Sequence, residues 1–145
     1  MLLAVAGLVS GGPAAWAALG GDAGSVPGDA AHLRAQSHGG NALAGYSVEE
    51  MQVPSGTVVK EYVSQDGKVF AVSWRGPTVP DLRLLLGTYF EQYVAAANER
   101  HLSHHQLTVR RDDLVVQSSG RMRAFFGRAY VPSLLPPDFQ LQDIQ

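Results

Sequence analysis

Apolar residues at helical spacing between positions 82 and 97 constrain the fold of this chain more than any other feature. They recur at i, i+3, i+4 and i+7 and onward, at Leu82, Leu85, Leu86, Tyr89, Phe90, Tyr93, Val94 and Ala97. Such spacing places all of them on one face of an amphipathic helix. Thr78 and Asp81 have the spacing of a capping box, and Arg100 supplies a cation near the C-terminal dipole. We therefore expect one long helix from about Thr78 to Arg100.

Segments before this helix have the character of β-strands. Thr57–Val63 and Val69–Trp74 are rich in β-branched and aromatic residues, and the Asp-Gly pair between them is typical of a hairpin turn. In the second segment, Phe70, Val72 and Trp74 are expected to share one face. No strand–helix–strand alternation is present. The sequence therefore predicts an α+β fold, an antiparallel β-sheet with one long amphipathic helix packed on one face.

The pattern also predicts the elements after the helix. They are short strands at Leu107–Arg110 and Leu114–Gln117, a turn at Ser118–Gly120, and a last long strand at Arg121–Val131. Gly127 is expected to mark a β-bulge, and a slip in the alternation at Glu49-Glu50 predicts either another bulge or a bent strand. We place a single α+β domain over residues 46–135. An extended C-terminal tail is expected over 136–145, where Pro136 and Pro137 keep the chain out of a sheet interior.

Residues 1–17 have the pattern of a secretory signal peptide. Leu2–Val9 is an apolar run, too short for a bilayer span of about 20 residues, and Ala15 and Ala17 fit the cleavage pattern. We expect cleavage after Ala17, export to the periplasm or medium, and no membrane span in the mature chain. A buried N-terminal helix is the alternative, which the following Gly-Gly-Pro sequence disfavours.

The expected signal peptide departs from the usual pattern in one respect. No Lys or Arg precedes its apolar run, so both Met1 and an upstream codon remain open as the true start. Residues 18–45 are rich in Gly and Ala and contain few large apolar side chains. We predict a flexible lead-in there, with one short helix at Gly28–Gln36.

Composition excludes several classes of function. The chain has 145 residues and a formal net charge of −2, whereas a nucleic-acid-binding protein or a polybasic membrane anchor needs a large basic excess. It contains no cysteine, which excludes a disulfide scaffold, a Cys-based zinc site, a thiol nucleophile and a lipid-modified N-terminal Cys. We predict no cofactor.

One group of residues is a candidate binding surface. Basic and aromatic side chains that later strands could bring together are Trp74, Arg75, Arg121, Arg123, Arg128 and Tyr130, with Phe125 and Phe126 beside them. Arg121 and Arg123 are expected to point the same way on one strand, and a bulge at Gly127 would add Arg128. Such a face suits an anionic ligand, a glycan or a protein partner. The alternative is a solvated strand face with its aromatic residues in the core.

No catalytic or metal-binding residues are predicted. His101 and His105 have the i, i+4 spacing of metal ligands and His104 lies beside them, but no carboxylate or thiol stands nearby. Ser118 and Ser119 lack the first glycine of a nucleophile elbow. Neighbouring acidic residues, such as Asp112 and Asp113, point to opposite faces of a strand and suit acid–base chemistry poorly.

Several short strings resemble a family of exported proteobacterial proteins known as domain of unknown function twenty-eight forty-four. The strings are Ala18–Gly21, Val53–Thr57, Val69–Pro77, Pro80–Arg83, Leu86–Phe90, Asp113–Gln117, Arg123–Phe125 and Tyr130–Pro132. The resemblance covers nearly the whole mature chain. It implies export and a single domain, and it brings no catalytic residues with it.

Two hypotheses of function follow. The first is a non-enzymatic periplasmic binding or accessory module whose partner is an envelope protein or an anionic envelope component. The second is a small periplasmic hydrolase or transferase, with His104 or His105 beside a carboxylate that folding brings close. A closed pocket holding such a pair would favour the enzyme, and an exposed apolar patch the binding module.

Overall fold

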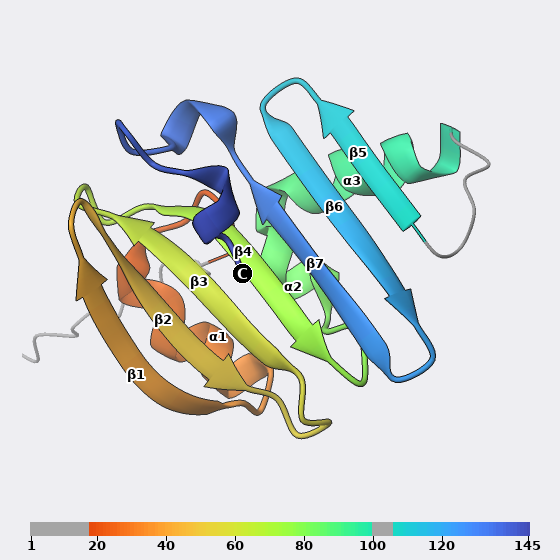
Figure 1. The fold of residues 1–145 in the computed structure, drawn as a ribbon, viewed down its shortest axis with the longest axis horizontal. Helices are drawn as coiled ribbons and strands as arrows, with labels where there is room; N and C mark the ends of the chain where they lie inside the picture. Colours follow the sequence, from red (N-terminus) through yellow and green to blue (C-terminus); the bar gives the residue numbers. More distant parts are fainter. Residues whose placement is uncertain (1–17, 100–105) are drawn as a thin grey trace, which may run out of the picture.

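Strands from both sides of the helical segment join into a single antiparallel sheet. The computed structural model describes residues 18–99 and 106–145, and its seven-stranded sheet has the order β1-β2-β3-β4-β7-β6-β5 (Figure 1). The strands are β1 (Gln36–Leu43), β2 (Tyr46–Gln52), β3 (Val58–Ser64), β4 (Val69–Gly76), β5 (Gln106–Arg111), β6 (Leu114–Arg121) and β7 (Ala124–Tyr130). At the centre, β4 pairs with β7, so the two halves of the chain share one sheet.

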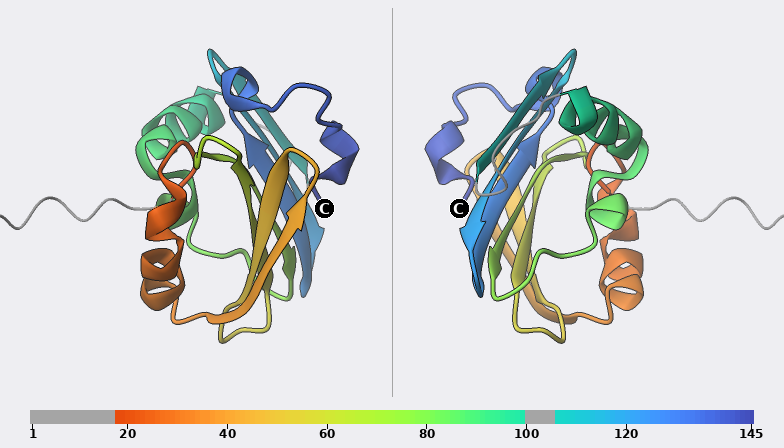
Figure 2. Two further views of the ribbon diagram at one scale, coloured as in Figure 1. Left: turned by 90° about the vertical axis from the view of Figure 1, so that its left-hand side faces the viewer. Right: turned by 90° about the vertical axis from the view of Figure 1, so that its right-hand side faces the viewer.

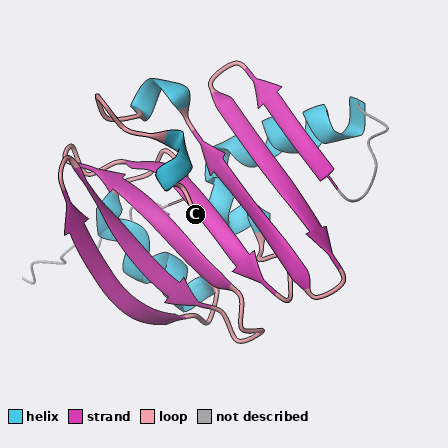
Figure 3. Ribbon diagram, in the orientation of Figure 1, coloured by secondary structure: helices cyan, strands magenta, loops and turns pink. Residues whose placement is uncertain are grey.

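Helices cover one face of this sheet (Figure 2). They are η1 (Ala23–Ser25), α1 (Val26–His32), α2 (Leu82–Leu86), η2 (Gly87–Tyr89) and α3 (Phe90–Glu99), and two short turns, η3 (Pro132–Leu134) and η4 (Leu141–Asp143), lie in the C-terminal segment. An antiparallel sheet combined with a helical segment is present as predicted, although the sheet dominates the fold (Figure 3).

The helical segment begins at Leu82 rather than at Thr78. Asp81 is its N-cap, because its carboxylate accepts hydrogen bonds from the backbone N–H groups of Arg83 (2.9 Å) and Leu84 (3.4 Å). Thr78 instead hydrogen-bonds to hydroxyl groups in the turn between β2 and β3. The predicted capping box is therefore wrong, and the helix is one turn shorter than expected.

A break in the regular α-helix lies at Gly87. This residue has a φ of +51°, which favours glycine, and a Cβ here would overlap the Cβ of Ala18. The next residue, Leu19, is fully buried, and its backbone N–H donates to the carbonyl of Leu85 (2.9 Å). The regular α-helix is thus interrupted at the point where the N-terminal part of the chain packs against it.

The apolar stripe of the helical segment packs on the sheet as its periodicity predicts as far as Tyr93, but in the last turn Ala96, which lies outside the stripe, is buried instead of Val94 and Ala97. Leu85 and Leu86 are completely buried against the sheet residues Val72, Trp74 and Val116 of the same core cluster. Leu82, Tyr89, Phe90 and Tyr93 are partly buried against this cluster. The main core therefore lies between the helices and one face of the sheet.

Residues 18–45 belong to the fold, which corrects the prediction of a lead-in. The expected short helix exists as α1, and strand β1 pairs with β2 over its whole length. No side chain of β1 is buried. Backbone hydrogen bonds rather than apolar side chains hold this strand, so its sequence shows no strand pattern.

The C-terminal segment covers part of the opposite face of the sheet (Figure 2), which the expected packing on one face did not include. Ile144 is buried in a second core cluster with Tyr62, Phe70 and Tyr130, and Phe139 packs against this cluster. The rings of Phe139 and Phe70 are 4.8 Å apart in an edge-to-face arrangement. The tail lies outside the sheet, as its prolines predict, but it packs on the sheet and does not extend away from it.

Two glycines were misread as a turn and a bulge. Ser118–Gly120 lies inside β6, and the turn falls at Met122-Arg123, so the expected long strand 121–131 is wrong. A Cβ at Gly120 would stand 2.6 Å from the ring of Phe125 on the paired strand. The register continues through Gly127 without a bulge. Both glycines allow close approach of aromatic rings and do not redirect the chain.

One of two irregularities of the sheet lies at Phe70. Tyr62 faces Ala71 and Val63 faces Val69, so Phe70 is an extra residue and packs on the tail side, away from Val72 and Trp74. β2 itself has no extra residue at Glu49-Glu50, because it keeps one register with β3, but its pairing with β1 shifts beside Glu50, where His38 of β1 is the extra residue. The alternation of β2 slips because the sheet buries side chains on both faces.

Candidate functional site

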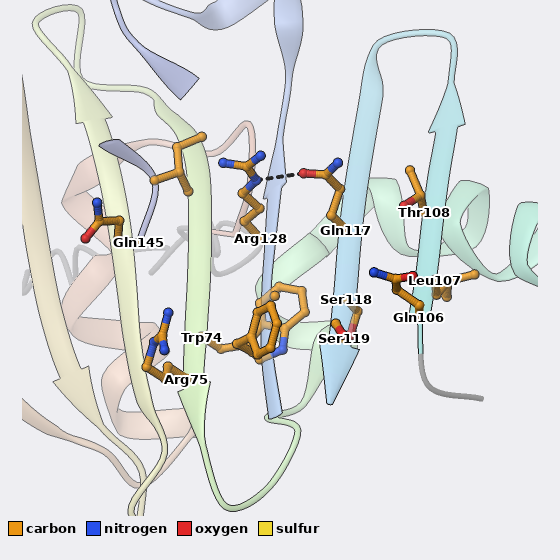
Figure 4. Close-up of a pocket in the computed structure, with 13 residues that line it drawn as sticks. Trp74, Arg75, Gln106, Leu107, Thr108, Gln117, Ser118, Ser119, Arg128 and Gln145 are labelled. Atoms are coloured by element: carbon orange, nitrogen blue, oxygen red, sulfur yellow. Dashed lines mark hydrogen bonds between the residues drawn. The ribbon is translucent and has the colours of Figure 1, made fainter. Parts of the chain in front are cut away.

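A groove of about 340 Å³ lies on the face of the sheet opposite the helices, between the C-terminal segment and edge strand β5 (Figure 4). It crosses β4, β7, β6 and β5. Its lining residues are Trp74, Arg75, Gln106, Leu107, Thr108, Gln117, Ser118, Ser119, Phe126, Gly127, Arg128, Ile144 and Gln145. The tail covers one half of this face, and the groove occupies the other half.

Strand register places the polar side chains of the groove together. Across β4, β7 and β6, Arg75 is paired with Phe126, and Phe126 with Ser119. Two residues after Phe126 on β7, Arg128 is paired with Gln117 of β6. Paired residues of neighbouring strands point to the same face, so these side chains all point into the groove.

Arg128 is the best-held cation of the groove. Its Nε donates to Oε1 of Gln117 (2.7 Å), and its Nη1 donates to the carbonyl of Leu141 in the tail (2.7 Å). A guanidinium has further N–H donors on its fork, and these are available to a ligand. Arg128 is half-buried, and its two hydrogen bonds already fix the orientation of its guanidinium. The side chain therefore loses little conformational entropy when a ligand binds.

Arg75 and Phe126 form the rim of the groove near the end of β4. The guanidinium carbon of Arg75 lies 5.6 Å from the centre of the Phe126 ring, within the range of a cation–π contact. Phe126 is 48% exposed, which is unusual for a phenylalanine in a sheet. The pair offers an apolar platform with a positive charge above it.

The remaining wall of the groove consists of amides and hydroxyls. Gln106 and Thr108 come from β5, Ser119 from β6 and Gln145 from the tail. The lining contains two arginines and no Asp or Glu side chain. In the described part of the chain, ion pairs join other residues and involve neither Arg75 nor Arg128. The groove therefore carries a positive potential together with neutral hydrogen-bonding groups.

Three of the six predicted surface residues line this groove, namely Trp74, Arg75 and Arg128. Trp74 lies beneath it: the residue is buried, and a Cβ at Gly127 would overlap its Cζ2 atom. Gly127 thus brings Arg128 to the face by an unbroken register, not by a bulge.

The other three predicted residues lie elsewhere. Tyr130 is 6% exposed and packs beneath the tail, so it does not stand at the rim as expected. Arg121 ends β6 and Arg123 lies in the β6–β7 turn with a φ of 63°, so they do not share one strand. Both are exposed and neither lines the groove.

The amides Gln106, Gln117 and Gln145 are the residues that sequence reasoning missed. Gln117 stands beside Arg128 only through the register of β6 with β7. Gln145 arrives through the fold of the tail, where its carbonyl accepts a hydrogen bond from Ser73 (2.8 Å). A correct placement of the β6–β7 turn would have shown from the sequence that Gln117 faces Arg128.

The other candidate groups lie away from the groove. His101, His104 and His105 fall outside the described residues. Within the described ranges, no group of three or more His, Cys, Asp or Glu side chains is arranged to hold a metal ion. A buried carboxylate, Glu61, lies on the helix face opposite Glu49 of β2, on the other side of the sheet from the groove.

The fold and the groove define a single-sheet antiparallel protein with an arginine-lined surface groove. The chain belongs to the family described as protein of unknown function (DUF2844), whose model matches residues 15–144. Neither a curated protein nor a solved structure was found to match it. Among residues 18–99 and 106–145, no helix is long and apolar enough to cross a membrane.

Proposed function

We propose that this protein is a non-enzymatic binding module of the bacterial envelope, whose groove holds an anionic ligand. The observation that supports this most strongly is Arg128, a half-buried guanidinium fixed by Gln117 and by the tail, in a groove lined without Asp or Glu side chains. An oriented guanidinium binds carboxylate or phosphate oxygens through paired, charge-assisted hydrogen bonds.

The chemistry of the lining favours an acidic sugar as this ligand. Arg128 and Arg75 suit a carboxylate, while the amides and hydroxyls beside them suit the hydroxyl groups of a sugar ring. The exposed ring of Phe126 suits the apolar face of the same sugar. A volume of about 340 Å³ is at the lower end of the range for ligand pockets.

Binding rather than catalysis is supported by the kinds of groups in the groove. Guanidinium, amide and hydroxyl side chains orient and hold a ligand. The lining contains no Asp, Glu, His, Lys, Tyr or Cys side chain, and these are the groups that usually act as general acid or general base.

Isothermal titration calorimetry with oligogalacturonate, and with galactose oligomers as the neutral probe, tests this function. We expect the acidic oligomer alone to bind, and Arg128→Gln to weaken it about ten- to hundredfold, because one charge-assisted contact is lost. Arg83→Ser removes the same charge from the exposed surface of α2 and should leave affinity unchanged. Equal binding of both oligomers, or an unaffected Arg128→Gln variant, would contradict the proposal.

Export is the second part of the proposal and is tested separately. It rests on the apolar run and the Ala-x-Ala pattern of residues 1–17. Protein recovered from the envelope fraction should begin at Ala18 when its N-terminus is sequenced. Recovery only of chain that begins at Met1, and only from the cytosol, would overturn this part.

A further inference from the structure

The described connections at one end of the sheet gather in space. β2, β4 and β6 all finish at this end, since Gln52 faces Val58, Gly76 faces Phe125 and Arg121 faces Ala124. The α1–β1 connection reaches the same end, because β1 starts opposite the last residue of β2. Figure 2 shows the β2–β3, β4–α2 and β6–β7 connections together along one edge of the molecule.

Charge is distributed unevenly between the two ends of the sheet. This end carries Arg34, Arg75, Arg121 and Arg123, all exposed, and we name it the arginine end. Its described connections contain one carboxylate, Asp81, which is engaged as the N-cap of α2. The described turns at the opposite end contain Asp22, Asp66, Asp112 and Asp113, together with one cation, Lys68, which pairs with Asp22 (2.7 Å).

The tip of the arginine end is the β6–β7 turn, and its residues are poorly suited to a turn. Met122 is 94% exposed. Arg123 has a φ of 63°, a conformation that costs free energy for any residue but glycine and, to a lesser degree, asparagine. Glycine at position 123 would make this turn with less strain, because glycine adopts a positive φ freely. The fold alone therefore gives no reason for Met and Arg here.

We propose that the arginine end is a contact surface for an anionic phospholipid bilayer. Met122 and the exposed Val79 of the β4–α2 connection enter the interfacial region, and the arginines meet the lipid phosphates. Long side chains of this kind place an apolar stem in the interface and a charge at the headgroups. Each basic residue near such a surface adds to the attraction.

The shape of the surface favours a bilayer over a protein partner. A stable protein interface buries about 800 Å² on each side and needs a complementary surface. Here the side chain of Met122 projects from a two-residue turn. Arg121 immediately precedes Met122 in the chain, and Arg123 immediately follows it. A fluid interface accepts a projecting tip without a matching cavity.

Vesicle co-sedimentation of the full chain tests this proposal. Vesicles of phosphatidylcholine alone are compared with vesicles that also contain phosphatidylglycerol. The apolar segment of residues 1–17 would add equal binding to both, so the difference between them measures the arginine end. We expect binding to phosphatidylglycerol vesicles that exceeds binding to phosphatidylcholine vesicles and falls as salt rises.

The double variant Met122→Asn/Arg123→Gly separates the contact from folding. It suits the turn, so its melting temperature should equal or exceed that of the unchanged chain, while the phosphatidylglycerol-dependent binding should fall about tenfold. Arg110→Ser removes one positive charge from an exposed position of β5 near the opposite end of the sheet and should keep this binding. No preference for phosphatidylglycerol, an unaffected double variant, or an equal loss in Arg110→Ser would overturn the proposal.

Arg75 belongs to both surfaces, so the bilayer contact and the groove are tested with variants that leave Arg75 unchanged. Arg128→Gln should keep vesicle binding, and Met122→Asn/Arg123→Gly should keep oligogalacturonate binding, because Arg128 and the turn are not in contact through any hydrogen bond of the described residues. Failure of one experiment therefore leaves the other proposal standing.

Discussion

Gly127 decides where the largest side chain of the sheet lies. It faces Trp74 across β4 and Ser118 across β6, and the indole of Trp74 lies over it. Because no Cβ stands there, the indole packs flat on β7 and the helices close over it. The indole N–H has no hydrogen-bond partner among the described residues, so tight packing is what stabilises this position.

Gly127→Ala should therefore destabilise the protein. A Cβ there would overlap Cζ2 of Trp74 and stand 2.8 Å from the backbone oxygen of Gln117, so both backbone and indole must shift. Overpacking of this kind costs about 1–3 kcal/mol. Thermal unfolding followed by circular dichroism measures the change. Gly28→Ala in α1 is the matched control, since its Cβ meets nothing within 4 Å and should raise stability slightly.

Among the elements, the helical segment contributes most through the two leucines that follow its first turn. Leu85 and Leu86 are the last two residues of α2, which has Asp81 as its N-cap and Gly87 as its C-cap. Both leucines are fully buried. Arg83 points outward, with its guanidinium over the ring of Phe90. Neighbouring positions of one helix thus differ sharply in what they contribute to stability.

Leu86→Ala should lower the free energy of unfolding by about 2–5 kcal/mol, since it leaves a cavity in the core. Arg83→Ala should change it by less than about 1 kcal/mol, because its ion pair with Glu91 (3.5 Å) is exposed. Chemical denaturation of both variants compares them directly. Similar losses would mean that the segment packs with a different face toward the sheet.

Elements with a periodic apolar pattern were predictable from the sequence, and those held by backbone bonds were not. The stripe from Leu82 to Tyr93 revealed the helix and its buried face. Strand β1 has no buried side chain, and its pairing with β2 leaves no trace in residue type. The two-sided burial of β2 looked like a bulge, because Val48 packs toward the tail and Met51 toward the helices.

Half of the residues predicted for the binding surface line the groove, and strand register explains why the other half do not. Trp74 and Arg75 belong to a strand whose position was correct, and Arg128 faces the groove because it is one pleat from Tyr130. Arg121 and Arg123 were misplaced with the β6–β7 turn. Contacts between strands distant in sequence depend on register, which a single sequence specifies only weakly at glycine-rich positions such as Gly120.

At the scale of the whole molecule, the sheet is covered on one face by helices and on half of the other by the tail. Polar contacts fix the end of this tail: the carbonyl of Gln145 accepts from the hydroxyl of Ser73 (2.8 Å) and of Tyr62 (3.1 Å). Leu141 is bound in turn by Arg128. The tail is thus both a part of the core and a wall of the groove, so we expect stability and the proposed binding to be coupled through it.

Phe139→Ala tests this coupling. The ring of Phe139 lies edge-to-face with Phe70 (4.8 Å) and Tyr46 (5.0 Å), and its removal should cost about 2–4 kcal/mol. Since the loosened tail holds Arg128 less firmly, affinity for oligogalacturonate should fall together with the melting temperature, in calorimetry on one sample. Leu43→Ala, at an exposed position of β1, should alter neither quantity. A lower melting temperature with unchanged affinity would show that the groove is built by the sheet alone, and the tail would then have a structural role only.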